Sequence, residues 1–185
     1  SKSASLSLWA KSMNPVDGYQ LDASQGNLFL AFHGQLEMLV EEGKAELVTR
    51  CTMCGIFPED TEVPLGVLAG LWGTDEVETE VEARRLAGEH LVELVDDGRA
   101  IQLLDPVRDY LRCRGKSSLE GWNVQLLNRA CGKMEQIPTK EHGYWGDGTE
   151  GRRHFAHHLI GCGDQIEGLN LAPKDLYHLG NVSDE

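Results

Sequence analysis

The feature that most constrains the fold is the Asp97-Gly98 pair, which lies between two short runs of β-type residues, 91–95 and 99–104. An Asp-Gly pair accepts the positive φ angles of a tight two-residue turn, so this spacing predicts a β-hairpin. Helical patterns lie on both sides of it. The stretch from Ile56 to Leu111 is therefore expected to combine a few helices with one small hairpin.

Two helices are expected before this stretch, because apolar residues recur there at helical spacing. Asn27 and Gly43 suit the start and the end of the first helix, over 27–42. Its predicted apolar face is Leu28, Phe29, Phe32, Leu36, Leu39 and Val40. A second helix over about 44–54 has the apolar stripe Leu47, Val48, Cys51 and Cys54. A Phe57-Pro58 break follows it.

Three more helices are expected within the stretch itself. Pro64 suits the first turn of one of them, whose predicted buried face is Leu65, Leu68, Leu71 and Trp72. Asp75, with Glu78 three residues on, predicts a capped helix over 76–90. That helix is expected to turn Val77, Val81, Ala83, Leu86 and Ala87 inward and Glu76, Glu78, Glu80, Glu82 and Glu89 outward. After the hairpin, Asp105 as N-cap and Pro106 at the first position predict one more helix.

The expected fold class is mainly α: a winged helix, meaning a helical bundle with a β-hairpin wing, followed by a small helical domain. We expect a lead-in segment over 1–26, the winged helix over 27–114 and an incomplete helical domain over 115–185. Because the chain begins at Ser1 and its first methionine is Met13, we also expect a processed product or a piece of a longer protein.

The charge is unevenly distributed, and this bears on possible partners. The net charge is −13, and residues 24–113 carry 18 acidic and 7 basic residues, a net −11. A winged helix often binds DNA, and Arg84-Arg85 fall on its expected recognition helix. The surrounding carboxylates oppose phosphate contact, so we expect no nucleic-acid partner.

Short motifs in a fixed order resemble the winged-helix domain of NB-ARC signalling ATPases, in the branch of apoptotic protease-activating factor and its WD-repeat relatives. The motifs are Ile56-Phe57-Pro58-Glu59-Asp60, Val63-Pro64-Leu65-Gly66-Val67-Leu68, Leu71-Trp72, Leu103-Leu104-Asp105 and Asp109-Tyr110-Leu111. Tyr144-Trp145 and the segment 154–159 resemble the start of the helical domain that follows in that branch. The resemblance spans roughly residues 27–160.

The resemblance implies that a histidine in a Met/Leu-His-Asp motif of that family senses bound ADP. Leu104 holds the histidine position here and Asp105 follows it. The chain also contains no Gly-x-x-x-x-Gly-Lys-Ser/Thr phosphate loop. We therefore expect no nucleotide or other cofactor in this chain.

Two groups of residues could bind a metal. His154, His158 and Cys162 stand at i, i+4 and i+8, which places them on one helix face. Cys51-x-x-Cys54 has ligand spacing but no matching second pair, and both cysteines fall on an apolar stripe, which favours core packing. A metal-stabilised interaction domain using the His/Cys face stays open as an alternative.

Candidate interaction residues are the acidic helix positions Glu76, Glu78, Glu80 and Glu82, and the aromatic residues Trp9, Tyr144 and Trp145. The carboxylates either dock a basic partner or form a solvated face. The aromatics either anchor an interface or close the helical layers. No activated nucleophile motif is present, which argues against Cys/His catalysis.

Together these features predict a non-catalytic interaction and regulatory module, a scaffold arm of a larger NB-ARC-like signalling protein. Its partners are expected to be proteins or neighbouring domains, and the sequence leaves the oligomeric state open. The apolar runs fall far short of about 18 residues, so no membrane span is expected. Five widely spread cysteines do not make a disulfide framework, which favours an intracellular, cytoplasmic location.

Overall fold

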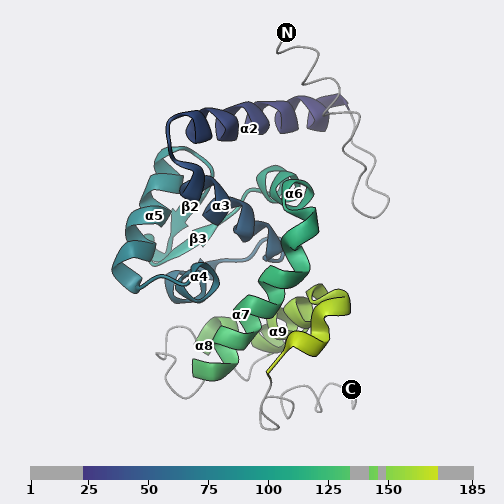
Figure 1. Ribbon diagram of the computed structural model, residues 1–185. Helices are drawn as coiled ribbons and strands as arrows, with labels where there is room; N and C mark the ends of the chain where they lie inside the picture. Colours follow the sequence, from purple (N-terminus) through teal and green to yellow (C-terminus); the bar gives the residue numbers. More distant parts are fainter. Residues whose placement is uncertain (1–22, 134–141, 146–148, 171–185) are drawn as a thin grey trace.

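The computed structural model describes residues 23–133, 142–145 and 149–170, and most of these residues lie in helices (Figure 1). The mainly α class expected from the sequence is confirmed. In chain order the α-helices are α2 (Ala23–Glu41), α3 (Ala45–Met53), α4 (Leu65–Trp72), α5 (Glu76–Gly88), α6 (Asp105–Arg114), α7 (Leu119–Lys133), α8 (His142–Trp145) and α9 (Thr149–Gly161). The short 3-10 helices are η2 (Cys54–Ile56), η3 (Asp96–Gly98), η4 (Lys116–Ser118) and η5 (Gly163–Gly168).

A three-stranded antiparallel sheet accompanies the helices. Its strands are β1 (Val63–Pro64), β2 (Glu93–Val95) and β3 (Ala100–Gln102), in the order β1-β3-β2. Ile101 at the centre of β3 faces Val63 on one side and Leu94 on the other. The hairpin predicted around Asp97-Gly98 is confirmed, but four residues, 96–99, join its strands instead of two. The backbone is left-handed at three of them, with φ 48° at Asp96, 54° at Asp97 and 81° at Gly98.

The first strand is a difference from the sequence prediction, which placed Pro64 inside a helical turn. Pro64 instead closes β1 and serves as N-cap of α4. A proline has no N–H to give to a neighbouring strand, so an edge strand is the part of a sheet that tolerates it. The prediction failed because two residues are too few to show a β pattern in the sequence.

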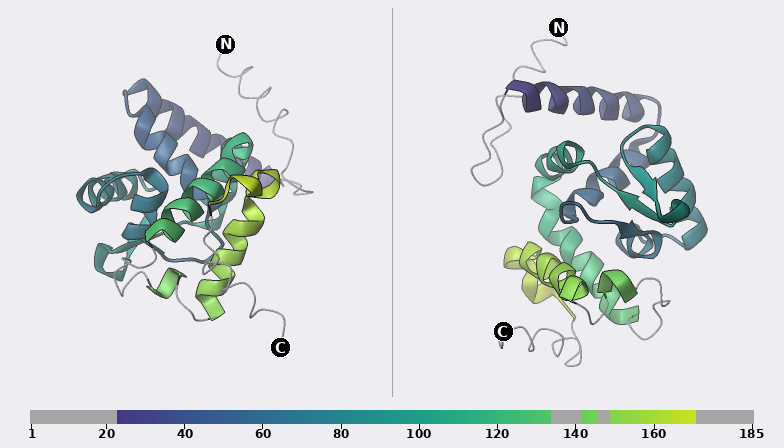
Figure 2. Two further views of the ribbon diagram at one scale, coloured as in Figure 1. Left: turned by 60° about the horizontal axis from the view of Figure 1, so that its bottom comes forward. Right: turned by 180° about the vertical axis from the view of Figure 1, so that it is seen from behind.

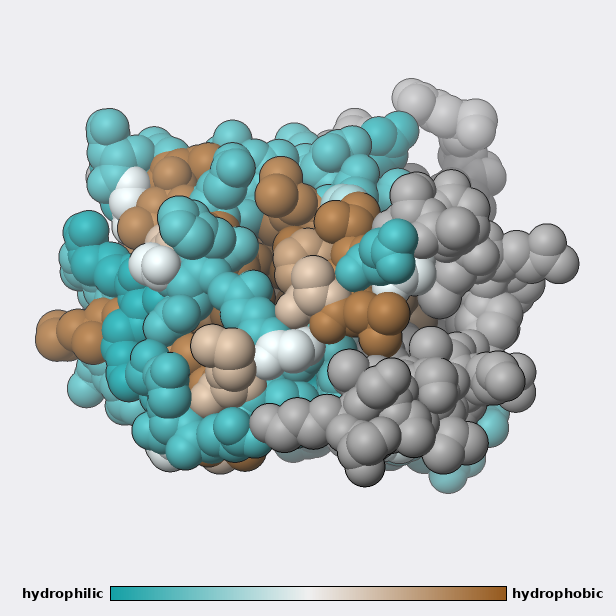
Figure 3. Space-filling view, turned by 90° about the horizontal axis from the view of Figure 1, so that it is seen from above, coloured by the Kyte–Doolittle hydropathy of each residue, from teal (hydrophilic) through white to brown (hydrophobic). Residues whose placement is uncertain are grey.

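Helix α2 begins at Ala23, four positions before the predicted cap at Asn27. Phe29, Leu36 and Leu39 point into the core as expected, but Leu28 and Val40 are exposed, which corrects the predicted face. Met38 is also exposed. The helix therefore presents apolar side chains outward, and Figure 3, seen from the α2 side, shows brown apolar patches between the teal polar residues.

The inward face of α5 is also corrected. Val77 and Val81 are 75% and 51% exposed, whereas Thr79 and Glu82 are buried beside Ala83 and Leu86. The buried positions follow the i, i+3, i+4, i+7 spacing of one helix face, and 77 and 81 lie outside it. The predicted N-cap is confirmed, because the Asp75 carboxylate accepts a hydrogen bond from the Glu78 backbone N–H at 2.8 Å.

The predicted N-cap of α6 is corrected. The helix begins at Asp105, so its N-cap is Leu104 rather than Asp105.

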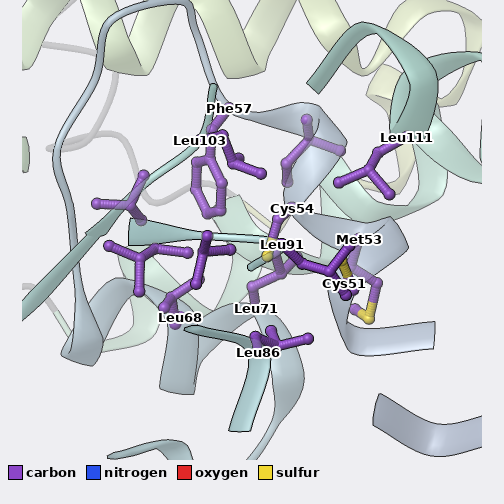
Figure 4. Close-up of a cluster of buried hydrophobic side chains, with 14 of the residues drawn as sticks. Cys51, Met53, Cys54, Phe57, Leu68, Leu71, Leu86, Leu91, Leu103 and Leu111 are labelled. Carbon is purple, nitrogen blue, oxygen red and sulfur yellow. The ribbon is translucent and has the colours of Figure 1, made fainter. Parts of the chain in front are cut away.

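The core gathers around the end of α3 and the loop that follows it (Figure 4). Cys51, Cys54 and Phe57 have no exposed surface and pack with Leu68, Leu71 and Leu86. Burial raises the pKa of Cys51 to about 12 and the pKa of Cys54 well above its usual value. The Cys51-x-x-Cys54 pair therefore packs in the core, as its apolar stripe predicted.

Helix α7 joins the sheet-bearing part to the last helices. Figures 1 and 2 show it descending from α6 to α8 and α9, at the opposite end of the molecule from α2. Leu126 and Leu127 on α7 belong to the same buried cluster as Leu68 and Leu71 of α4. Arg129 adds a hydrogen bond of 2.8 Å to the carbonyl of Gly70. The boundary predicted at 114/115 is thus bridged by side-chain packing.

No helix in the described ranges is both long enough and apolar enough to cross a bilayer.

Candidate binding groove

A buried chain of three polar side chains holds α7, α8 and α9 together. The Tyr144 hydroxyl lies 2.8 Å from Nε2 of His158, and Nδ1 of His158 lies 2.7 Å from Oδ1 of Asn123. Each of the three residues is at most 4% exposed. Phe57 closes this site from the core side, with its ring edge-on to those of Tyr144 and His158.

The amide of Asn123 fixes the proton positions in this network. Its Nδ2 donates to the carbonyls of Leu119 and Gly161, at 2.8 and 3.3 Å, so Oδ1 is the atom that faces His158. Nδ1 of His158 therefore donates, and Nε2 accepts from the Tyr144 hydroxyl. Burial holds the pKa of His158 well below its usual value and raises that of Tyr144. A neutral histidine enclosed in this way is a structural link rather than an accessible base.

His154 and His158 of the predicted metal face lie on α9 and Cys162 follows its last residue, but His158, Cys162 and Nδ1 of His154 already have hydrogen-bond partners. Nδ1 of His154 lies 3.1 Å from the Tyr144 carbonyl, and the Cys162 thiol donates to the carbonyl of His158 at 3.2 Å. Burial raises the pKa of Cys162 to about 11. Among the described residues, no group of three or more His, Cys, Asp or Glu side chains is placed to hold a metal ion.

The aromatic pair of α8 lies inside the molecule. Tyr144 is 2% exposed and Trp145 is 9% exposed, and their rings pack edge-on at 4.8 Å. Of the two interpretations left open, closing the helical layers is the one this burial favours. Trp9, the third aromatic candidate, lies outside the described residues.

Beside this network lies a groove of about 630 Å³ between the sheet-bearing part and the last two helices. Four segments contribute its walls: the loop and strand at 60–66, the first turns of α5, the turn and strand at 96–100, and the α8–α9 helices. The described lining residues are Asp60, Thr61, Glu62, Pro64, Leu65, Gly66, Glu76, Glu80, Asp96, Arg99, Ala100, Tyr144, Glu150 and His154. This volume lies within the range of sites that take a small ligand or a few side chains.

Carboxylates dominate the groove. Asp60, Glu62, Glu76 and Glu150 form no ion pair with any described residue. The remaining two, Glu80 and Asp96, pair with Arg84 at 2.7 Å and with Arg99 at 3.8 Å. Arg99 is the one cationic side chain among the described lining residues. The groove therefore offers many hydrogen-bond acceptors and little positive charge.

Tyr144 and His154 are the two largely enclosed polar side chains that line the groove. His154 is 8% exposed, and its ring stacks on that of Tyr144 with centroids 4.2 Å apart. Because the Tyr144 carbonyl can only accept, Nδ1 of His154 is the donor. This bond and the ring stacking hold the imidazole in one orientation beside the groove.

The four acidic candidates on α5 separate into two pairs. Glu76 and Glu80 line the groove. Glu78 and Glu82 instead face Arg50 of α3: Glu78 accepts from its guanidinium at 2.6 Å, and the largely buried Glu82 lies 3.8 Å away and also pairs with Arg85 at 2.7 Å. The prediction that Glu82 points outward is wrong, because Arg50 draws its carboxylate against α3.

The remaining predicted positions lie elsewhere. Leu104 and Asp105 are exposed at the start of α6, outside the groove. Arg84 and Arg85, the residues considered for DNA contact in the sequence, form ion pairs within their own helix.

Sequence reasoning missed Asp60, Glu62, Asp96, Arg99 and Glu150, since each is an ordinary charged residue near a turn. Only the folding of distant segments onto one another brings them together. No protein-family model and no curated protein matches this sequence, so the geometry of the groove carries the functional inference.

Proposed function

We propose that this chain is a non-catalytic interaction module that binds protein partners through the acidic groove. The observation that carries this proposal is the contrast between the groove and the interior. Accessible charged groups gather along the groove, whereas Cys51, Cys54 and Cys162 are buried and Tyr144 and His158 are buried and bonded to each other. A thiol whose pKa is raised by burial is a poor nucleophile.

The finer proposal is that the first part of the module is a winged helix. Support comes from the order α3, β1, α4, α5, β2 and β3, in which a helical trio is followed by a hairpin, and β3 lies between β1 and β2. The ion pairs of Arg84 and Arg85 on α5 favour a protein-facing role for this helix over contact with phosphate.

We further propose that the module serves as a scaffold arm in a larger intracellular signalling protein of the NB-ARC kind. Exposed apolar side chains on α2 support this. Leu28 and Met38 are 44% and 59% exposed on a helix whose other side is buried. A helix with apolar side chains on both sides is typical of one packed between two partners. Leu104 at the family's nucleotide-sensing position supports a role in packing instead of ADP sensing.

Calorimetric titration of the full chain with ADP and with magnesium ATP, together with elemental analysis, tests this function. The proposal predicts no nucleotide binding, no nucleotide hydrolysis and no stoichiometric metal. Binding or hydrolysis of nucleotide by this chain alone would contradict it. One zinc per chain would favour the metal-stabilised alternative through His154, His158 and Cys162.

A further inference from the structure

We draw no further inference here: the strongest candidate, the outward face of α2 at which Leu28, Ala31, Gly34 and Met38 are exposed, carries none because nothing in the structure shows what covers it.

Discussion

Asn123 is the residue on which the joining of α7, α8 and α9 depends most directly. Its side chain donates to the carbonyls of Leu119 and Gly161 and accepts from His158, all in the interior. A side chain at Gly161 would clash with this amide, since a Cβ there would lie 2.6 Å from Asn123 Nδ2. One amide thus bonds its own helix and α9, and His158 extends the link to Tyr144 of α8.

Asn123→Ala should lower the free energy of unfolding by about 2–3 kcal/mol, because it leaves the His158 Nδ1–H buried without a partner and removes the bond to the Gly161 carbonyl. Asn128→Ala on the same helix is the matched control. Its hydrogen bonds to Gly168 and Asn170 are exposed, so its loss should cost under about 1 kcal/mol. Urea unfolding of both variants makes the measurement, and equal costs would contradict the role given to Asn123.

The stability of the protein should depend on pH through His158. Burial holds the pKa of His158 well below 6.5 in the folded chain, whereas unfolding returns it close to 6.5. Between these two pKa values the unfolded chain binds the extra proton, so the free energy of unfolding falls as the pH drops below about 6.5. The slope from this one group approaches about 1.4 kcal/mol per pH unit.

His33 and His157, whose pKa values burial also lowers, contribute in the same direction. Because more than one histidine contributes, the informative quantity is the difference from a variant. Urea unfolding at a series of pH values should give His158→Gln a flatter slope than the unaltered chain. Parallel slopes would show that His158 is not held neutral.

At the scale of elements, α5 shows what the sequence could and could not predict. The helix, its cap at Asp75 and the inward Ala83 and Leu86 follow from spacing alone. The burial of Glu82 does not, because it depends on Arg50 approaching from α3. Val77 and Val81 looked like core residues by type, yet the packing of α3 and α4 selects a different face.

Two substitutions on α5 check this reassignment of its faces. Leu86→Ala should lower the free energy of unfolding by about 2–5 kcal/mol, the usual cost of a cavity at a fully buried leucine. Val77→Ala should change it by less than about 0.5 kcal/mol, since Val77 is 75% exposed and alanine favours helix. Thermal or urea unfolding gives both values. A cost above about 1.5 kcal/mol for Val77→Ala would show that Val77 is buried, as the sequence predicted, and would contradict the reassigned face.

The groove also contains residues that the sequence could predict and residues that it could not. Glu76 and Glu80 could be picked out as interaction candidates because they share an acidic helix. Asp60, Arg99 and Glu150 could not, since each comes from a different turn or helix. Strand β1 was equally hidden, because two residues ending in Pro64 carry no period that a sequence pattern can reveal.

At the scale of the whole molecule, packing across the predicted 114/115 boundary joins the two parts. Nε2 of His157 lies 2.9 Å from the Ile56 carbonyl, and Arg129 donates to the last turn of α4. The groove depends on this contact, because 60–66 and 96–100 form one wall and α8 and α9 the other. The two parts therefore need to hold a fixed relative position for the groove to keep its shape.

The most direct test of the account is nuclear magnetic resonance mapping of the isotope-labelled full chain as hexa-arginine peptide is added. The account predicts the largest amide shifts at 60–66, 96–100 and 150–154, and at Glu76 and Glu80, with little change along α2 or η5. Shifts concentrated on α2 or η5, or spread evenly over the surface, would contradict the assignment of the groove as the site of interaction.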